Sequence, residues 1–510
     1  MIASIRSATI LGARGLPVNV EVHVGKGLPG LTILGLPDES CREARDRVRA
    51  AVTSSGYAWP EKKITVNLAP PIHRKTGSGL DLAIAIGVLV ASEMVPADAV
   101  HELGFLGELG LDGRIRRVPG VAPMVGVHPD SDWVVPTDAA NEAAIVARGV
   151  IRHAALLDDL IKALTGAAAW PDRDPVSAGA GDLLDSVELH DLADVKGQPH
   201  ARLALEAAAA GGHHLLFVGP PGAGKTMLAR RLTGLLPDLD PESALETTMI
   251  HSASGATLPA SGLITRPPFR APHHTSSTGS LVGGGSHSFR PGEISLAHGG
   301  ALFLDEMGQF EPKVLDALRE ALETGRIMVG RVLHDRLPIP ARFQLIGATN
   351  PCPCGGGGSP ADCECDERSR SRYIGRLSGP LLDRFDIRVA VSPPATEELF
   401  GGQPGESTAE VAARVRTARK LADDRSGMLN ARLDENGLNE FAPLTATASR
   451  LLFGEVESGK LTARGLHRVR RVARTIADLA GEPGEIADEF VIQALSLRAR
   501  VGRSAVGRAA

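Results

Sequence analysis

The feature that most restricts how this chain can fold is a glycine-rich octapeptide set between a strand pattern and a helix pattern. The apolar run HLLFVG leads into it, the helical pattern MLARRLTGLL follows it, and the segment matches G-x-x-x-x-G-K-[ST]. Its residues are Gly219, Pro220, Pro221, Gly222, Ala223, Gly224, Lys225 and Thr226. In such a context backbone N–H groups wrap the phosphates of a nucleotide, Lys225 reaches the β- and γ-phosphates, and the Thr226 hydroxyl binds Mg²⁺. The octapeptide therefore predicts an ATP and Mg²⁺ site, and a plain glycine-rich turn is the weaker interpretation.

Two further strand patterns end in polar side chains. ALFLDE ends in Asp305 and Glu306, and FQLIGATN ends in Asn350. Because ligands of open α/β sheets lie at the carboxyl ends of the strands, we expect these side chains beside the phosphate loop. Asp305 would hold Mg²⁺ through water, Glu306 would orient and activate the attacking water, and Asn350 would position that water beside the γ-phosphate. The structural alternatives are an acidic strand end before a helix and a turn asparagine.

The patterns along the 510 residues predict three domains and a linker. Residues 1–165 alternate strand and helix patterns as a compact α+β domain, and residues 166–186 form an Ala-, Gly-, Pro- and Asp-rich linker. Residues 187–393 alternate apolar strands with helices, which is typical of a parallel α/β sheet. Residues 394–510 are helical in pattern and predict a lid domain.

Composition argues against three classes of protein: membrane-spanning proteins, secreted proteins and small basic nucleic-acid binders. With 23% charged residues and no charge-free apolar run of 18 residues, we expect no membrane span, and the N-terminus lacks a secretion signal, so a cytoplasmic protein is expected. The net charge of −5 excludes the overall basic field of small nucleic-acid binders, so any DNA contact must be local.

The order of motifs resembles one family over nearly the whole chain. DVKGQPHARLALEAAAAG, GPPGAGKT, RPGEISLAHGGALFLDE, ATNPCPCG and GPLLDRFD are similar to the AAA+ clade of the magnesium-chelatase motor subunit and the MCM helicases. The nearest resemblance is to the YifB/ComM family, called magnesium chelatase-like. It implies an α/β fold class, with an AAA+ P-loop parallel sheet, a C-terminal helical lid and an N-terminal α+β Lon-protease-like domain.

The same resemblance implies roles for residues outside the phosphate loop. Arg384 in LLDRFD would be the arginine finger that enters the neighbouring subunit's site, which implies an oligomer, expected to be a homo-hexamer. Arg464 would be the sensor arginine of the lid, with Arg471 as a second candidate and a solvated arginine face as the alternative, and Gln198 would lie near the adenine.

The segment of about 252–300 resembles the helix-2 insertion of the clade, a loop directed into the ring pore. His273 and His274 in it lack a helical metal-ligand spacing, so we expect the loop to contact substrate rather than to bind a metal.

Four of the five cysteines lie in one loop, residues 352–365. Cys352, Cys354, Cys363 and Cys365 form two C-x-C pairs separated by eight residues. Four thiolates on two short turns suit a structural Zn²⁺. The spacing differs from the usual C-x₂-C, so reduced thiols without a metal stay as the alternative. Cys41 is expected to be an ordinary buried thiol.

The N-terminal stretches GSGLDLAIAIGVL and FLGELGLDGRIRRVPGV resemble the Lon-protease-like fold. Aligned on these stretches, Gly79 stands at the nucleophile's position and Ala122 at the lysine's, although Ser78 is adjacent. Because acyl-enzyme chemistry needs an activated nucleophile, we expect a non-peptidase domain.

Two functions follow from the resemblance. The first is a ring motor that couples ATP hydrolysis to remodelling of single-stranded or branched DNA, like the branch-migration helicases of transformation and recombination. The alternative is a magnesium chelatase-like motor that remodels a partner protein and has no DNA substrate. A Lon-like ATP-dependent protease is disfavoured by Gly79 and Ala122.

Overall fold

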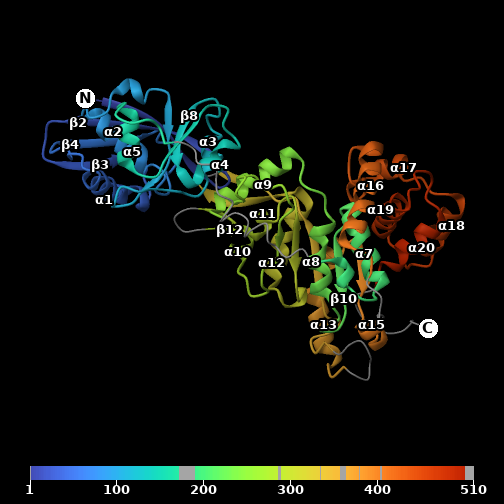
Figure 1. Ribbon diagram of the computed structural model, residues 1–510. Coiled ribbons are helices and arrows are strands. Elements are labelled where there is room, and N and C mark those ends of the chain that lie inside the picture. Colours follow the sequence, from blue (N-terminus) through green and yellow to red (C-terminus); the bar gives the residue numbers. More distant parts are fainter. Residues whose placement is uncertain are drawn as a thin grey trace.

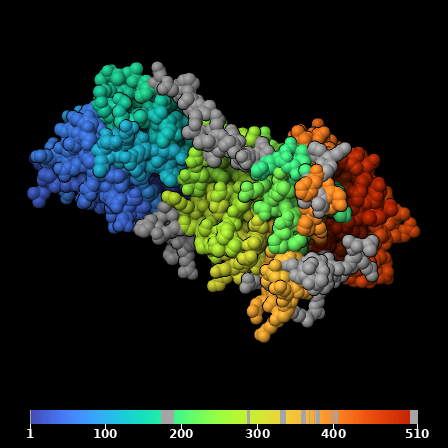
Figure 2. All heavy atoms as spheres, turned by 60° about the horizontal axis from the view of Figure 1, so that its bottom comes forward, coloured from blue at the N-terminus to red at the C-terminus, as the bar shows by residue number. Residues whose placement is uncertain are grey.

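The computed structural model describes residues 2–171, 190–284, 289–332, 335–355, 363–377, 379–401 and 405–499. Figure 1 shows an N-terminal domain at one end, a central sheet, and a helical C-terminal region at the other end. The space-filling view of Figure 2 shows the same order, with the central region between the two ends. Most of the expected linker, and part of the loop between the two cysteine pairs, lie outside the described residues.

The N-terminal domain is built on a seven-stranded mixed sheet in the order β3-β4-β2-β1-β5-β8-β9. Its strands are β1 (Ile2–Leu11), β2 (Arg14–Gly25), β3 (Gly30–Leu34), β4 (Lys63–Ala69), β5 (Leu103–Phe105), β8 (Asp132–Pro136) and β9 (Ile151–Ala154), with β6 (Glu108–Leu109) and β7 (Ile115–Arg116) as a separate pair. β1 pairs antiparallel with β2 and β2 with β4, whereas β5, β8 and β9 run parallel to β1. The expected α+β character is confirmed.

Helices cover both faces of this sheet because its side chains alternate between two cores. Val134 of β8 points into one core and Trp133 and Val135 into the other. The first core takes α1 (Glu39–Ser54), α2 (Asp81–Ala91) and α5 (Leu157–Leu164), and the second takes α3 (Val121–Val125) and α4 (Ala140–Ala144). All residues of α2 are buried, which explains its almost uniformly apolar sequence.

The central sheet is parallel, with the order β11-β14-β17-β10-β18. Its strands are β10 (Leu215–Val218), β11 (Phe269–Arg270), β14 (Ala301–Leu304), β17 (Gln344–Thr349) and β18 (Ile387–Ala390). Every residue of β10, β14 and β17 is buried, as expected for a sheet covered on both faces. The expected parallel α/β sheet is confirmed.

One strand of this sheet was not predicted. β11 lies inside the segment of about 252–300 that resembles the helix-2 insertion, and it pairs with β14. A two-residue strand is too short to show a period, which is why the sequence pattern missed it. The hairpin of β15 (Arg326–Val332) and β16 (Asp335–Pro340) was also missed. The remaining short pair is β12 (Gly283–Gly284) with β13 (Arg290–Pro291).

Helices also cover the two faces of the central sheet. One face packs on α7 (Pro199–Gly211) and α8 (Lys225–Leu235), and the other packs on α12 (Pro312–Thr324). The other helices of this region are α9 (Pro241–Ser254), α10 (Thr278–Val282), α11 (Glu293–Leu296), α13 (Glu367–Arg376), α14 (Gly379–Leu382) and α15 (Thr396–Gly401).

The C-terminal region is helical, as expected for a lid. It contains α16 (Thr408–Ser426), α17 (Glu435–Phe441), α18 (Ala446–Glu457), α19 (Ala463–Leu479) and α20 (Asp488–Ser496). A capping box of Ser407 and Glu410 starts α16. The apolar residues of these helices share one core with α7 and α8, so the lid packs directly on the helix that follows the phosphate loop.

The N-terminal domain contacts the central region through α9. The Gly120 N–H donates to Ser252 O at 2.8 Å, and the Ser252 hydroxyl donates to the buried Glu142 carboxylate at 2.5 Å. The Asn141 side chain donates to Ala260 O at 2.7 Å. None of the helices in the described part of the chain is long and apolar enough to cross a membrane.

Candidate nucleotide site

Three adjacent strands bring the predicted phosphate-binding residues to one edge of the central sheet. β17 lies between β10 and β14, and all three run parallel. The phosphate loop follows β10, Asn350 follows β17, and Asp305 and Glu306 follow β14. The loop is fixed to its neighbour by the Gly219 N–H, which donates to Thr349 O at 3.1 Å.

Glycine is required at specific points of the loop. Gly222 and Gly224 have φ angles of 76° and 88°, a left-handed conformation that a side chain disfavours. A Cβ at Gly219 would lie 2.0 Å from Val391 O, so only glycine fits there. Gly224 is directly followed by α8, so the loop ends at a helix N-terminus, where backbone N–H groups and the helix dipole favour an anion.

The Lys225 ammonium lies at the centre of this edge. It donates to Gly219 O and Pro220 O at 2.7 Å each, and to Asn350 Oδ1 at 3.0 Å. Burial lowers the pKa of Lys225, while the charges of Asp305 and Glu306 act in the opposite direction. The lysine and the predicted sensor asparagine are therefore in direct contact.

Thr226 at the start of α8 and Asp305 after β14 form a pair of oxygen-bearing side chains. The Thr226 hydroxyl donates to Asp305 Oδ2 at 2.6 Å. Hydroxyl and carboxylate oxygens are ligands that Mg²⁺ accepts, usually together with waters and substrate phosphates. The donor set that was expected to hold Mg²⁺ is therefore assembled in space.

Glu306 has an additional neighbour that sequence reasoning did not predict. Its backbone is left-handed, with φ 48°, and its Oε2 lies 3.5 Å from Nδ1 of His274. His274 comes from the segment after β11, and its ring packs against that of His273 with centroids 4.1 Å apart. The motif PFRAPHHT draws attention to His274 but does not predict its contact with Glu306, because that contact depends on where β11 pairs with β14.

Gln198 contacts the phosphate loop itself. Its side-chain Nε2 donates to Ala223 O at 2.8 Å and to Ser392 O at 3.3 Å, and its backbone is left-handed with φ 54°. Its Oε1 is buried and has no hydrogen-bond partner among the described residues. A buried unsatisfied acceptor next to the loop is consistent with a ligand donor at this position.

Arg384 lies at the opposite edge of the same sheet. β18 pairs in parallel register with β10, from Leu215↔Ile387 to Val218↔Ala390. Arg384 precedes β18 whereas the phosphate loop follows β10, so the strand alone separates the two levels by about 10 Å. Its guanidinium forms an ion pair with Glu323 of α12 and is 38% exposed. The structure therefore does not bring Arg384 to the phosphate loop of its own chain.

The two arginines considered as lid sensors also lie apart from the loop. Arg464 is exposed in the first turn of α19. The Arg471 Nε donates to Leu433 O at 2.7 Å, within the lid. Among the described residues, no hydrogen bond or ion pair joins either side chain to the phosphate loop.

The four clustered cysteines come together in space. All four Sγ atoms lie within 4.8 Å of one another. Three of the separations are 3.3, 3.7 and 3.6 Å. Zn–S bonds of about 2.3 Å in a tetrahedron place sulfurs about 3.8 Å apart, so the cluster fits a Zn²⁺ ion. A Cβ at Gly355 would lie 2.6 Å from the ring of Pro221, so the first cysteine turn packs on the phosphate loop.

The N-terminal domain does not assemble a serine–lysine pair around the predicted positions. The Ser78 hydroxyl contacts the Glu108 carboxylate, and the buried Lys75 donates to the carbonyls of Pro70 and His73. Gly79 and Ala122 provide no reactive group. Cys41 is buried as expected, and burial together with Asp38 raises its pKa far above the usual range.

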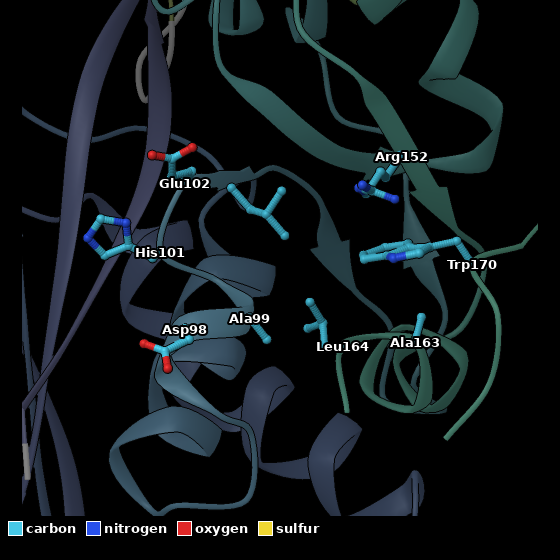
Figure 3. Close-up of a pocket in the computed structure, with 9 residues that line it drawn as sticks. Asp98, Ala99, His101, Glu102, Arg152, Ala163, Leu164 and Trp170 are labelled. Carbon is cyan, nitrogen blue, oxygen red and sulfur yellow. The ribbon is translucent and has the colours of Figure 1, made fainter. Parts of the chain in front are cut away.

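A cavity of about 720 Å³ opens elsewhere in this domain, and Figure 3 shows the side chains around it. The Arg152 guanidinium lies 4.6 Å from the centre of the Trp170 ring. The described residues that line it include no serine, threonine, cysteine or lysine; they are Asp98, Ala99, His101, Glu102, Leu103, Arg152, Ala163, Leu164 and Trp170. This described lining therefore offers no nucleophile of the kind that peptidases use.

Comparisons with known proteins match the chain to one family in three successive segments. Three magnesium chelatase family descriptions match: "Subunit ChlI of Mg-chelatase" over residues 20–138, "Magnesium chelatase, subunit ChlI" over 191–399, and "Magnesium chelatase, subunit ChlI C-terminal" over 405–498. A stretch of 201 residues is 27% identical to Lon protease 2 of Bacillus subtilis and covers 34% of each chain. The last match agrees with the Lon-like resemblance of the N-terminal domain.

Whole-chain relatives narrow the family further. Competence protein ComM of Haemophilus influenzae is 40% identical over 503 residues, which cover 98% of both chains. YifB of Escherichia coli is 42% identical and covers 97% of this chain and 96% of its own length. An uncharacterised protein of Mycobacterium tuberculosis is 44% identical over 96% of this chain. The chain therefore belongs to the magnesium chelatase-like AAA+ family that includes YifB and ComM.

Proposed function

We propose that this protein is an ATPase whose active sites form between subunits of a ring. The observation that carries the proposal is the split of the site: Lys225, Thr226, Asp305 and Asn350 meet at one sheet edge, and Arg384 lies at the other. A second copy of the chain can bring its Arg384 to the phosphate edge of the first. We propose a homo-hexamer, and size measurement with and without ATP tests it.

The side chains divide the work of hydrolysis. The phosphate loop and Lys225 bind the β- and γ-phosphates, and Gln198, which fixes the Ala223 carbonyl, supports the loop near the nucleotide base. Asn350 positions the attacking water and Glu306 accepts its proton. Arg384 from the next subunit stabilises the charge that develops on the transferred phosphoryl group. Arg464 of the lid is the proposed sensor of nucleotide state.

Mg²⁺ is the cofactor that this donor set fits, with Thr226 and Asp305 as its protein-side oxygens. When bound, the ion neutralises charge on the β- and γ-phosphates. The decisive assay compares ATP hydrolysis by the wild type and by Lys225→Ala at several protein concentrations. If the wild type neither binds nor hydrolyses ATP under conditions where it assembles, the proposal is wrong.

DNA is the substrate that we propose for the motor. The support is the 40% identity over nearly the full length to a protein named for competence. Because the chain carries a net charge of −5, its DNA contact must be a local one, and the segment after β11 is the proposed contact. Stimulation of the ATPase by forked or single-stranded DNA should fall steeply with salt, since phosphate contacts release counterions.

The alternative is a motor that remodels a partner protein, as the family descriptions of magnesium chelatase suggest. It predicts ATP hydrolysis without any response to DNA. A parallel assay with single-stranded, duplex and forked DNA separates the two, because only the first function links the hydrolysis rate to the nucleic acid.

We also propose one structural Zn²⁺ per chain at Cys352, Cys354, Cys363 and Cys365, in a reducing cytoplasm where such thiols stay free. Cys365→Ser and Cys365→His form a matched pair for the test. Serine is the closer isostere but a poor zinc ligand, whereas histidine is larger and ligates zinc. Metal analysis should find zinc in the wild type and Cys365→His and much less in Cys365→Ser. Wild-type protein free of zinc after purification without chelators would refute the site.

A further inference from the structure

The turn that carries Arg384, residues 383–386, is held by hydrogen bonds and ion pairs to the lid of its own chain. It lies between α14 and β18, and aspartates stand at both of its ends. Asp386 is buried, whereas the Asp383 side chain is 49% exposed. We call these four residues the arginine turn.

Asp386 connects the arginine turn to the lid through a buried histidine. Nδ1 of His213 lies 3.0 Å from Asp386 Oδ2, and its Nε2 lies 2.8 Å from Thr475 Oγ1 of α19. The His213 side chain is fully buried, two residues before β10 begins. Burial favours the neutral form of Asp386, but the His213 hydrogen bond and nearby positive charges outweigh it and lower the pKa of Asp386.

The lid makes two more contacts with the same turn. The Arg468 guanidinium on α19 lies 3.7 Å from Asp383 Oδ1 and 3.6 Å from Asp386 Oδ1. Arg498, beyond α20, donates to Asp386 O at 3.2 Å and its backbone bridges to Arg388 of β18. Two parts of the lid, α19 and the stretch after α20, therefore hold the segment that leads into β18.

Because of these contacts, we expect the lid and the arginine turn to move together. A buried polar group that loses its partner costs about 1–3 kcal/mol, so the lid cannot shift while Asp386 stays in place without that cost. Arg384 itself is only partly covered and points to Glu323 on α12 rather than into the network. The network therefore fixes the base of the turn and does not include the guanidinium, which is paired with Glu323 and partly exposed.

We propose that Asp386, His213 and Arg468 are positioning residues that couple the lid of one subunit to the Arg384 it offers to the neighbouring subunit's ATP site. The inference rests on the proposed shared active site and adds the direction of signalling. Nucleotide bound in one subunit moves that subunit's lid, and the lid resets the arginine at the next interface. Arg468→Ala should therefore impair hydrolysis in the neighbouring subunit's site, not in its own.

Mixed rings test this directly. Lys225→Ala subunits lack a working site but keep their arginine, and Arg384→Ala subunits keep the site but lack the arginine. Co-assembled at equal amounts, these two should recover about one quarter of the wild-type ATPase rate, because one interface in four joins an intact site to an intact arginine. If this reference pair recovers nothing, the shared site itself is wrong, whatever Arg468 does.

Arg468→Ala is then mixed with each reference variant. Recovery with Lys225→Ala and none with Arg384→Ala is the expected result, since Arg468→Ala then behaves as an arginine-deficient subunit. The reverse pattern, or wild-type activity of Arg468→Ala alone, would overturn the proposal. Arg468→Lys keeps the charge and should restore part of the rate, and Arg416→Ala, an exposed arginine of α16, is the lid-surface control.

Asp386→Asn is the second variant. It keeps the shape of the buried side chain but removes the charge that faces His213 and Arg468. The same pattern in the two mixtures is expected, and circular dichroism of each variant checks that it is folded. Folded Asp386→Asn that recovers activity with Arg384→Ala instead would place the aspartate in its own subunit's site and overturn the proposal.

Discussion

Lys225 in the central region is the first residue of α8, directly after a glycine-containing turn, and Lys75 in the N-terminal domain lies in a glycine-containing turn that leads into α2. Each ammonium donates to two backbone carbonyls, those of Gly219 and Pro220 for Lys225 and those of Pro70 and His73 for Lys75. Burial lowers the pKa of both lysines. The local chemistry of the two turns is therefore similar.

Their surroundings differ. The turn after Lys75 is closed by its own domain: the Gly77 N–H donates to the Asp38 carboxylate, and the buried Asp81 forms a bidentate pair with Arg47. Around Lys225, Pro221 and Gly222 are exposed and the Glu306 side chain is 45% exposed. The turn before Lys225 is therefore open to a ligand, whereas the turn that holds Lys75 is closed by contacts within its own domain.

The largest expected effect separates the two lysines. Lys225→Ala should lower ATP hydrolysis by roughly 10³-fold, because it removes a cation that faces the developing charge. Lys75→Met should leave the rate per folded molecule within about twofold and instead destabilise the N-terminal domain by roughly 2 kcal/mol, since it leaves carbonyls unpaired. Steady-state ATPase assays give the first quantity. Denaturant unfolding followed by tryptophan fluorescence gives the second, because Trp59 and Trp133 lie in that domain and Trp170 packs against its core.

A similar loss of hydrolysis in Lys75→Met, with the domain still folded, would contradict the expected difference between the two lysines. It would mean that the N-terminal turn takes part in nucleotide turnover.

The next effect concerns the carboxylates beside each lysine. Glu306→Gln should reduce hydrolysis by about 10²-fold or more while ATP still binds, because the amide cannot accept the proton of the attacking water. Binding of a fluorescent ATP analogue and hydrolysis of ATP, measured on the same preparation, separate the two steps. Loss of binding together with hydrolysis would show that Glu306 holds the nucleotide rather than the water. Glu108→Gln, its counterpart beside Ser78, should change neither quantity.

Part of the site around Lys225 could be predicted from the sequence, and part could not. The phosphate loop, Asp305, Glu306 and Asn350 follow buried apolar strands of four to six residues, so local patterns predicted their place at one sheet edge, and the structure assembles them there. β11 is two residues long and could not be recognised by a period. His274 reaches Glu306 only because β11 pairs with β14, and His213 meets Asp386 and Thr475 across 173 and 262 positions of chain. Contacts of this kind depend on tertiary packing, which one sequence does not reveal.

One buried group in each region, His214 and Asp81, should make contributions to stability that respond to acid with opposite signs. Burial lowers the pKa of His214, in the central region, to about 4, and its Nδ1 accepts the Leu345 N–H at 3.0 Å. The unfolded chain binds a proton there below about pH 6.5, so this histidine removes stability as the pH falls from 6.5 to about 4. Burial raises the pKa of Asp81, in the N-terminal domain, to about 6, although Arg47 acts against it.

The folded N-terminal domain therefore binds a proton at Asp81 that the unfolded chain releases near pH 4. Its contribution is fully present below about pH 4 and is lost as the pH rises to 6, on the order of 2 kcal/mol. Urea unfolding by tryptophan fluorescence, for the wild type and Asp81→Asn at pH 4.5 and 7, measures it as the change in their difference. A difference that does not change with pH would mean that Asp81 stays ionised in the folded domain. His214→Gln, followed by circular dichroism of the whole chain, gives the opposite slope.

The smallest effect concerns the outside partner of each glutamate, His274 for Glu306 and Ser78 for Glu108. The His274 and Glu306 side chains are 27% and 45% exposed, so their pair is worth at most about 1 kcal/mol, or about fivefold in rate. If His274 draws Glu306 away from the attacking water, His274→Ala should raise basal hydrolysis by up to that factor and weaken its stimulation by DNA. Ser78→Ala should leave both unchanged. A lower basal rate in His274→Ala would instead show that the histidine holds Glu306 in its working position, and the segment after β11 would then support catalysis at rest rather than restrain it.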